Sequence, residues 1–438
     1  MQHQFPCYYC DHNVSGEIGM TDYDVVVIGG GPAGMMSAGR AAEVGASVAL
    51  LEKNSEPGKK LLITGKGRCN FAHNEEDPLK IAEAFGRNGR FLLSALSRFG
   101  LRETLDFFSS RGVEPVAERG KRFFPAAGQN AYNVRSALMD YMMEKGVKIL
   151  TGSPVLSLEG KNGKVTHAVM AGSRKLGGRN FIVSTGGLSY PSTGSTGDGM
   201  QWARDTGHKI TPTEPSICPV EAKEHFCKEL QGLSLRNISL SVWQNGKKIE
   251  ERSGEMLFTH FGVSGPIIMD LSRTIALLLK KGPVTLFLDM KPALDERKLD
   301  GRLLRDFSKL AGKEIGTCVR GLVPRAMVPV ILKLAGIHED KSIDAITREE
   351  RRDLVEALKN ISITPVALLG YRWAIVTAGG VSLKDVDPRT MASKKADNLF
   401  FAGEVLDLDA PTGGFNLQAC WTTGFVAGEE AALRAIQK

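Results

Sequence analysis

The 438-residue chain lacks the signals of a membrane or secreted protein. No uncharged apolar run approaches the roughly eighteen residues needed to cross a bilayer. The N-terminus also lacks the basic-then-apolar pattern of a secretory signal peptide. The composition, 42% hydrophobic and 24% charged, is that of a globular protein and excludes a mostly disordered chain. We therefore expect a cytoplasmic protein of two or three domains with no membrane partner.

A disulfide framework is also missing. The seven cysteines are odd in number and follow no regular spacing, so reduced thiols are expected. Cys7-x-x-Cys10 with His12 resembles half of a tetrahedral metal site, but no second CxxC completes it. We predict no metal site and interpret residues 1–19, before the internal Met20, as a disordered extension.

The main sequence signal lies between Tyr23 and Lys53. The apolar run Val25–Ile28 enters Gly29-Gly30-Gly31-Pro32-Ala33-Gly34, and a helix-like segment follows. A second apolar run, Ala46–Leu51, ends on Glu52. Strand, glycines, helix, strand and acid in this order predict a βαβ dinucleotide-binding unit, with an ordinary structural turn as the alternative.

Each conspicuous residue of this unit has a physical role in the prediction. Gly29 permits the tight turn, Gly31 removes the Cβ that would face a pyrophosphate, and Gly34 lets the helix pack closely on the strand. The helix N-terminus favours the negative charge of the pyrophosphate. Glu52 can accept hydrogen bonds from the ribose hydroxyls of an adenosine. These features alone do not separate FAD from NAD.

Acidic residues are absent from two basic segments. The formal net charge is +7, and neither residues 59–70 nor residues 87–102 contain an acid. Such a surface suits a polyanion such as nucleic acid. Solvated surface, together with lysines that face the cofactor phosphates, is the alternative.

The first basic segment belongs to a glycine-punctuated loop, residues 58–70. Gly65 and Gly67 would let the backbone approach a flat ring or a phosphate, and Asn70 offers both a donor and an acceptor. Arg68 would lower the pKa of the adjacent Cys69 thiol if the two side chains lie close. The alternative for Cys69 is a small buried hydrophobic residue.

The order of predicted elements indicates a fold interrupted by an insert. Short strands and a hairpin near residues 147–163 predict an antiparallel meander, and Phe181–Gly187 predicts a central parallel strand. Buried strands return at residues 373–381 and 399–404. We therefore predict an α/β class with a Rossmann-like cofactor-binding domain, a parallel sheet plus a β-meander. The predicted bounds are 20–190 with 374–438 for this domain, and 191–373 for the insert, β-rich at about 215–290 and helical at about 291–360.

The C-terminal segment favours FAD over NAD. Gly403-Glu404 ends a predicted strand and supplies an acid near the ribityl chain of a long dinucleotide. The helix that opens at Gly413 would direct backbone N–H groups at the pyrimidine edge of a flavin, where negative charge develops on reduction. A second complete GxGxxG is missing, so NADH or NADPH is expected to bind transiently as the electron donor.

Motifs along the whole chain carry a resemblance to a known family. They are GGGPAG at 29–34, GKKLLITGKGRCN at 58–70, TGGLSYPSTGSTGDG at 185–199, LFTHFGVSGP at 257–266, TAGGV at 377–381 and GEVLDLDAPTGGFNLQ at 403–418. From Met20 onward the chain resembles the BaiN/RdsA-like flavoproteins, formerly called NAD(FAD)-utilising dehydrogenases. It departs from the family at Lys66, where a third glycine is more common.

The resemblance implies an FAD domain interrupted by an insert with β-barrel and helical parts. It also implies reduction of a conjugated ring C=C, with hydride from NAD(P)H by way of the flavin and a proton from an acid. Cys69 is the candidate acid because it is a thiol in the flavin-side loop, with Tyr190 and His260 as further candidates. A purely structural role is the alternative for each.

The predicted cofactor contacts lie at the ends of strands and in the loops that follow them. They are Gly29, Gly31, Ala33, Gly34, Glu52, Lys53, Lys60, Gly65, Gly67, Arg68, Asn70, Val155, Thr185, Gly186, Gly187, Gly403, Glu404, Gly413, Gly414, Phe415, Asn416 and Leu417.

Three functional hypotheses follow. The first is reduction of uridine to dihydrouridine in 23S ribosomal RNA. The second is reduction of a small-molecule enone of the 3-oxo bile acid or steroid type. The third is a flavin-containing RNA-binding factor without turnover. The sequence indicates no oligomeric state.

Overall fold

The computed structural model describes residues 23–437, which form two compact units. The first unit comprises residues up to Glu214 and from Val376 onward, and the second comprises Pro215–Ile375. The insert therefore begins at residue 215 rather than at the predicted 191. The predicted extension 1–19, with its CxxC pair, lies outside the described residues.

The boundary differs because residues 191–214 take part in the first unit. Helix α6 (Asp198–Asp205) contacts the meander strand β7 (Val155–Lys161). Strand β10 (Ile210–Ser216) then pairs with β18 (Val376–Val381), the strand through which the chain returns. The glycine-rich loop before α6 carries no sequence signal of a domain boundary.

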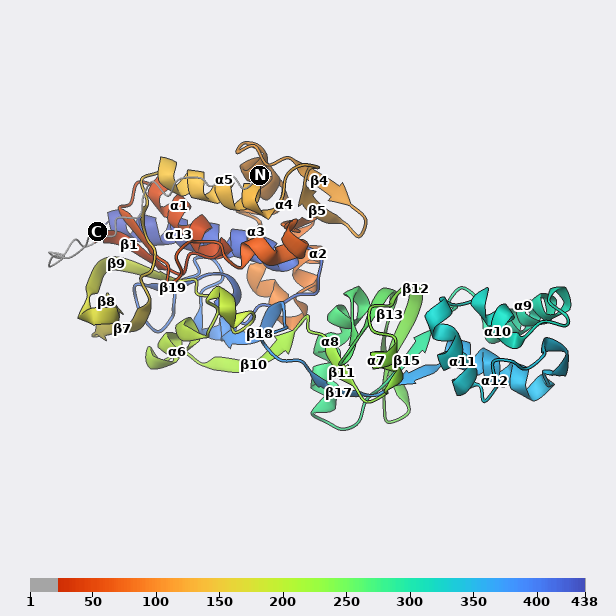
Figure 1. The fold of residues 1–438 in the computed structure, drawn as a ribbon. Helices are drawn as coiled ribbons and strands as arrows, with labels where there is room; N and C mark the ends of the chain where they lie inside the picture. Colours follow the sequence, from red (N-terminus) through yellow and green to blue (C-terminus); the bar gives the residue numbers. More distant parts are fainter. Residues whose placement is uncertain (1–22, 438) are drawn as a thin grey trace. The chain divides into compact units, whose positions relative to one another are not determined.

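A parallel sheet forms the centre of the first unit (Figure 1). Its five parallel strands, in spatial order, are β6 (Lys148–Leu150), β2 (Val48–Leu51), β1 (Tyr23–Ile28), β9 (Lys175–Val183) and β19 (Leu399–Phe401). In β1, Val26 pairs with Ala49 on one side and Phe181 on the other. Strands β2 and β19 and the second halves of β1 and β9 are continuous apolar runs because both faces of the sheet are buried there.

An antiparallel extension completes this sheet. Strands β7 and β8 (Lys164–Met170) form a hairpin, and β8 pairs with the first half of β9. The second half of β9 pairs in parallel with β1 and β19. The predicted parallel sheet with a β-meander is therefore confirmed.

Three helices lie side by side over the sheet, namely α1 (Pro32–Glu43), α13 (Phe415–Ile436) and α5 (Ala131–Glu144) (Figure 1). Helix α1 contacts both α13 and α5. A Cβ added at Gly424 or Gly428 of α13 would stand 2.5 or 2.3 Å from a carbonyl oxygen of α1. Glycine at these two positions lets the helix backbones approach closely. The C-terminal helix is thereby held against the N-terminal fingerprint.

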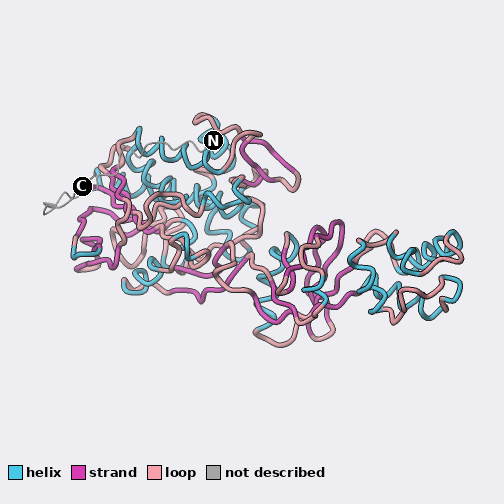
Figure 2. The backbone as a smooth tube through the Cα atoms, in the orientation of Figure 1, coloured by secondary structure: helices cyan, strands magenta, loops and turns pink. Residues whose placement is uncertain are grey.

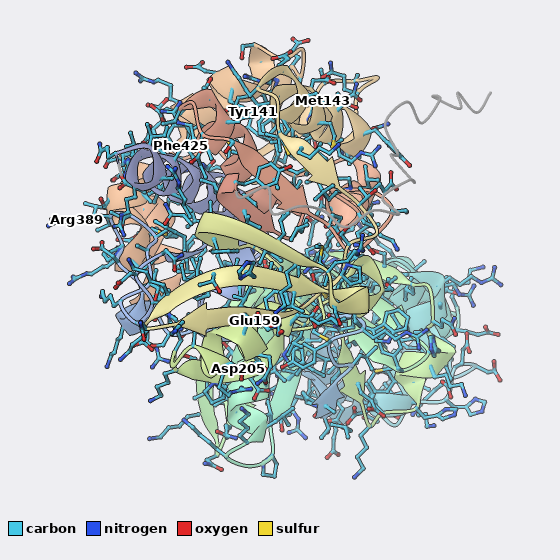
Figure 3. The ribbon with its side chains drawn as sticks, turned by 90° about the vertical axis from the view of Figure 1, so that its left-hand side faces the viewer. Tyr141, Met143, Glu159, Asp205, Arg389 and Phe425 are labelled. Atoms are coloured by element: carbon cyan, nitrogen blue, oxygen red, sulfur yellow. The ribbon has the colours of Figure 1, made fainter. Side chains whose placement is uncertain are left out.

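Aromatic rings pack beside these helices. Tyr141 of α5 and Phe425 of α13, both labelled in Figure 3, contact Phe107 and Phe99, respectively. The Tyr141 hydroxyl donates to Glu43 at 2.8 Å. Residues 78–109 of the same unit form short helices. They are α2 (Pro78–Glu83), α3 (Leu93–Leu96) and α4 (Leu101–Ser109), with a 3₁₀ segment at Gly86–Leu92.

A small antiparallel sheet adjoins these helices in the first unit. Its strands, in spatial order, are β3 (Ala72–His73), β5 (Arg122–Pro125) and β4 (Pro115–Glu118). Strand β3 directly follows the basic loop at 58–70, which contains 3₁₀ turns at Leu61–Gly67.

The second unit contains an antiparallel sheet of seven strands. In spatial order they are β16 (Ile361–Ile363), β15 (Thr285–Asp289), β12 (Ser234–Gln244), β13 (Lys247–Thr259), β14 (Gly262–Ser264), β11 (Val220–Ala222) and β17 (Pro365–Leu368). The two ends of this order, β16 and β17, are separated in the chain by Thr364 alone. One bent segment therefore closes the strands into a barrel-like ring.

The rest of the second unit is helical, and Figures 1 and 2 show helices α9–α12 apart from most of its strands. The main helices are α8 (Pro266–Leu279), α9 (Glu296–Lys309), α10 (Ile315–Arg320), α11 (Val328–Leu334) and α12 (Arg348–Lys359). Helix α8 packs against β13 and was not predicted from the sequence. Among residues 23–437, no helix combines the length and apolar character needed to span a bilayer.

Candidate flavin site

The first glycine turn lies between β1 and α1. Gly29 has a φ of +103°, and a Cβ there would stand 2.7 Å from the Ser184 carbonyl oxygen. A Cβ at Gly34 would stand 1.8 Å from the Gly29 carbonyl oxygen. At Gly31, by contrast, no atom of the described chain lies within 4 Å of a Cβ position. The turn is therefore packed on its inner side and open at Gly31, directly before the helix N-terminus.

Glu52, at the end of β2, is buried beside this turn. Its Oε2 accepts a hydrogen bond from the Gly30 N–H at 2.8 Å, and its Oε1 accepts two from Asn54. These bonds hold the carboxylate in one orientation, and Oε2 keeps capacity for a further donor such as a ribose hydroxyl. The neighbouring Lys53 is engaged elsewhere, since its Nζ lies 2.7 Å from Asp198.

The third strand end, that of β9, completes this side of the site. Ser184 donates to the Gly29 carbonyl at 2.9 Å, which ties β9 to the first turn. The buried hydroxyl of Thr185 has no hydrogen-bond partner within the described chain. A bound polar group could hydrogen-bond to the unpaired Thr185 hydroxyl and occupy the open space at Gly31 on the adjacent strand end. These residues therefore fit the dinucleotide part of FAD.

The loop after β9 joins the N-terminal and C-terminal parts of the site. A Cβ at Gly187 would stand 2.4 Å from the Thr377 hydroxyl and 3.2 Å from Glu404 Oε1. Gly186 has a φ of +73°, a conformation that favours glycine. Glycine at position 187 lets the loop lie against Thr377 of β18 and against Glu404, which follows β19.

Glu404 and Lys60 form an ion pair across the site. Their Nζ–Oε2 distance is 2.8 Å, although 344 positions separate them in the chain. Glu404 Oε1 also accepts from the Thr377 N–H at 2.8 Å. Gly403 packs against Ala33 of α1, so the acid after β19 lies beside the first helix. The structure thus brings Lys60 of the basic loop to the strand end predicted to contact the ribityl chain.

The second glycine turn precedes α13. Gly413 and Gly414 have φ values of +128° and +101°, and a Cβ at Gly414 would stand 2.3 Å from the Ala72 carbonyl oxygen. The Asn70 amide, oriented to match its neighbours, accepts from the Gly414 N–H at 3.1 Å and donates to two carbonyls of β3 and β5. Asn416 braces the turn by bonding both backbone groups of Ala410.

The beginning of α13 provides donors for an electron-rich ring edge. The N–H groups of its first turn, which includes Phe415 and Leu417, have no acceptor within the helix. They carry the positive end of the helix dipole. The fit to the pyrimidine edge of a flavin rests on these donors.

His73 of β3, which is not among the predicted site residues, also contacts this turn. Its Nδ1 lies 3.0 Å from the Gly413 carbonyl oxygen, and its ring stacks on Phe415 with centroids 4.0 Å apart. Burial lowers the pKa of His73 below its usual value. The neutral ring therefore donates Nδ1–H to Gly413, which leaves a lone pair on Nε2. A lone histidine outside any motif gave no sequence signal.

The basic loop has an unusual backbone. Gly65, Lys66, Gly67 and Cys69 have φ values of +56°, +58°, +84° and +63°. Lys66 thus occupies a left-handed conformation that favours glycine.

The condition under which Arg68 would lower the pKa of Cys69 is not met. The Cys69 side chain is fully buried, and burial raises the pKa of its thiol to about 12. Arg68 instead pairs with Glu118, and its guanidinium lies 4.2 Å from the Phe124 ring centre. Cys69 is therefore protonated and is not exposed to solvent in this conformation.

The remaining candidates lie in different places. Tyr190 is partly exposed in the loop after β9, with a φ of +51°. Val155 is buried at the start of β7. His260 belongs to the second unit, where it is exposed beside Phe261. Cys69 and Tyr190 therefore share the first unit, and His260 does not.

The parallel sheet and its two glycine turns define a Rossmann-type flavoprotein, an oxidoreductase that binds FAD. The model of the HI0933-like protein Rossmann domain matches residues 23–430. The chain therefore belongs to the HI0933-like family.

Curated relatives match nearly the whole chain. A 3-dehydro-bile acid delta(4,6)-reductase of Clostridium scindens is 31% identical and covers 93% of this chain and 98% of its own length. A ribosomal RNA dihydrouridine synthase of Haemophilus influenzae is 29% identical, with coverage of 91% and 96%. The enzyme of the same name from Escherichia coli is 27% identical, with coverage of 94% and 98%. The predicted BaiN/RdsA-like relationship is confirmed.

Solved structures show the same fold at low sequence identity. A 3-ketosteroid delta1-dehydrogenase from Sterolibacterium denitrificans has a TM-score of 0.55 at 14% identity, with 94% of this chain and 100% of that chain covered. A flavocytochrome c3 fumarate reductase has a TM-score of 0.54 at 16% identity, with coverage of 95% and 79%. The predicted fold class and FAD are confirmed, whereas NADH or NADPH as donor stays a prediction.

Proposed function

We propose that this chain reduces a uridine of 23S ribosomal RNA to dihydrouridine, with NADH or NADPH as a transiently bound electron donor, in the cytoplasm. Two relatives named ribosomal RNA dihydrouridine synthase match 91% and 94% of the chain and support the substrate class. When bound, the flavin would supply hydride transfer to the electrophilic carbon of the conjugated C=C.

One structural observation carries the choice of RNA. The basic loop at 58–70 contains no acid. Near its start it is held to the flavin part of the site by the Lys60–Glu404 ion pair, and at its last residue by the Asn70–Gly414 hydrogen bond. Positive charge beside the reacting end suits a substrate with a phosphate backbone, whereas an apolar enone has no need of it.

The cofactor would be held from both ends of the sheet edge. The open turn at Gly31 and the N-terminus of α1 would hold the pyrophosphate, and Glu52 would accept from the adenosine ribose. Glu404, fixed by Lys60 and Thr377, would face the ribityl chain, and the first turn of α13 would donate to the pyrimidine edge. The other predicted cofactor contacts stay predictions.

The proton donor must reach a substrate that enters from solvent. Cys69 is fully buried, so it would have to move first. Tyr190 is partly exposed, and the neighbouring Ser189 N–H fixes its loop by donating to the Thr377 hydroxyl at 3.0 Å. We therefore assign to Tyr190 the transfer of a proton to the carbon next to the one that receives hydride.

Tyr190→Phe tests this assignment because it removes the hydroxyl and keeps the ring. We expect product formation to fall about a hundredfold, while anaerobic bleaching of the flavin by NADH or NADPH stays at the wild-type rate. Unchanged product formation would exclude Tyr190 as the donor. Cys69→Ser is the companion variant. If product formation falls in this variant and not in Tyr190→Phe, the Cys69 thiol is the proton donor instead.

The substrate itself is tested by nucleoside analysis of 23S ribosomal RNA. A deletion strain should lack one dihydrouridine, and the purified protein with NADH or NADPH should restore it in the extracted RNA. Unchanged dihydrouridine in the deletion strain would contradict the proposal.

A second candidate is reduction of a small-molecule enone, which the bile acid reductase among the relatives favours. It predicts oxidation of NADH or NADPH with a 3-oxo-Δ4 steroid and no salt-dependent binding of RNA. The third candidate, an RNA-binding factor without turnover, predicts bound flavin that neither donor reduces.

A further inference from the structure

The β4–β5 hairpin carries a second group of basic residues next to the basic loop. Its tip is Arg119-Gly120-Lys121, and Arg122 begins β5. Lys121 has a φ of +55°, and Gly120 has a φ of +77°. The side chains of Arg119 and Lys121 are exposed at this tip. These residues lie outside the motifs and the predicted cofactor contacts.

The hairpin and the basic loop form one surface. The Phe71 N–H donates to Phe123 at 3.1 Å, and the Asn74 N–H donates to Lys121 at 2.7 Å. The Arg68 guanidinium lies 4.2 Å from the centre of the Phe124 ring, and that of Arg122 lies 5.9 Å from it. We name this surface the basic hairpin patch. Its members are Lys66, Arg68, Arg119, Lys121 and Arg122.

Positive charge exceeds negative charge on the patch. Two acids contact it, Glu118 through Arg68 and Glu75 through Lys121. The hydrogen bond from Arg68 lowers the pKa of Glu118, and the hydrogen bond from Lys121 lowers the pKa of Glu75, so both acids are ionised and already occupied. Within residues 23–437, no acidic side chain forms an ion pair with Lys66 or Arg119.

The patch is continuous with the flavin end of the site. His73 pairs with Arg122 across β3 and β5, and the same His73 contacts the Gly413 carbonyl at the second glycine turn. One β-bridge thus separates the patch from the turn that precedes α13. Lys53 and Lys60, which lie closer to the cofactor turns, are already paired with Asp198 and Glu404.

We propose that the basic hairpin patch binds the phosphodiester backbone of the RNA on either side of the reduced uridine. This inference rests on the proposed function and adds the surface that recognises the substrate. Arginine forks and lysine ammonium groups bind phosphate oxygens, and they position a nucleic acid without reading its sequence. The pairing of His73 with Arg122 between β3 and β5 would then hold the RNA backbone at a constant distance from the second glycine turn.

The double variant Lys66→Gln/Arg119→Gln tests the patch. Both side chains are exposed, and neither has an ion-pair partner among residues 23–437, so their loss leaves the packing intact. The probe is 23S ribosomal RNA extracted from a deletion strain. Loss of two phosphate contacts should lower the slope of log affinity against log salt by about two and weaken binding about tenfold or more at low salt.

The matched control is Lys161→Gln/Arg174→Gln, which removes two exposed charges from the β7–β9 meander of the same unit. It should bind RNA as the wild type does. Both double variants should keep bound flavin, and both should keep the wild-type rate of flavin reduction by NADH or NADPH.

The outcomes separate the inference from the proposed function. If the wild type reduces the RNA and the patch variant binds it with unchanged slope and affinity, the patch is not the docking surface. An equal loss in the control variant would also overturn the inference, because the effect would then be one of general charge. If the wild type neither binds nor reduces ribosomal RNA, the proposed function fails, and the inference fails with it.

Discussion

The two glycine turns of the flavin site each lead into a helix, but the contacts that require glycine are local at the first turn and distant in sequence at the second. Each precedes a helix N-terminus, α1 after Gly29–Gly31 and α13 after Gly413–Gly414. At the first turn, the nearest obstacle to a Cβ at Gly34 is the turn's own Gly29 carbonyl. At the second, the obstacle at Gly414 is Ala72, which lies more than three hundred positions away in the chain.

This difference has a consequence for recognition. A turn that is constrained by its own neighbours in the chain leaves a compact motif, which is visible in any sequence. A turn that is constrained by a distant strand leaves only a glycine pair, because the contact that demands it belongs to another segment. The four predictions below test whether the two turns differ in this way.

The largest effect is expected for Gly34→Ala. Its Cβ would stand 1.8 Å from the Gly29 carbonyl oxygen. Relief of this clash would require the backbone of α1 or of the turn after β1 to move. We expect a loss of about 3 kcal/mol or more in the free energy of unfolding. Calorimetry should show the first unit melting about 5–10 °C lower. A wild-type melting temperature would show that the close approach of α1 and β1 is not required.

Gly414→Ala should have the next largest effect. The new Cβ would stand 2.3 Å from the Ala72 carbonyl oxygen at a φ of +101°. We expect about 2 kcal/mol of destabilisation and a changed flavin absorption spectrum, since the α13 turn would shift. Gly128→Ala is the matched control, because Gly128 has a φ of +90° and open space around its Cβ position. Equal losses in both variants would mean that strain alone acts, without a contact to β3.

Gly31→Ala should separate binding from folding. Its Cβ would meet no atom of the described chain within 4 Å, and its φ of −76° suits any residue. The protein without FAD should therefore melt at the wild-type temperature. The added methyl group would occupy the space of the pyrophosphate, so the Kd for FAD, measured by fluorescence quenching, should rise at least about tenfold. An unchanged Kd would contradict the assignment of this turn to the pyrophosphate.

The smallest effect concerns His73 and pH. Burial lowers the pKa of His73 in the folded state, so the unfolded chain binds more protons near and below pH 6.5. Stability should therefore fall as the pH is lowered through this range. His73→Gln should lose less stability than the wild type between pH 7.5 and 5.5 in urea unfolding. Part of the fall should persist, because burial also lowers the pKa of His208. Identical pH profiles would show that His73 does not contribute.

The sequence predicted the elements whose signals are local. The apolar runs of β1, β2, β9 and β19 identified the parallel sheet, because strands buried on both faces contain little else. The order of these runs also predicted that the chain's two ends share one domain. It did not reveal α8, whose apolar residues at 266–279 follow a motif that was noted only for its resemblance to the family.

Local sequence could not predict the pairing of side chains across the site. Lys60 with Glu404, Asn70 with Gly414 and His73 with Gly413 each join segments more than three hundred positions apart. Arg68 shows the same limit, because its neighbour in the chain is Cys69 but its partner in the fold is Glu118. Adjacent residues can point in different directions, so proximity in sequence does not decide whether Arg68 lowers the pKa of the Cys69 thiol.

The amino-acid order was therefore enough to establish the class of fold, the cofactor and the first glycine turn, since periodic burial and a compact glycine motif are properties of neighbouring residues. The tertiary structure decided the rest. Only it shows that the second glycine turn is held by β3, that Cys69 is buried and protonated, and that the hairpin tip continues the basic loop. Each of these depends on contacts between distant segments, which form only when the burial of the whole sheet brings those segments together.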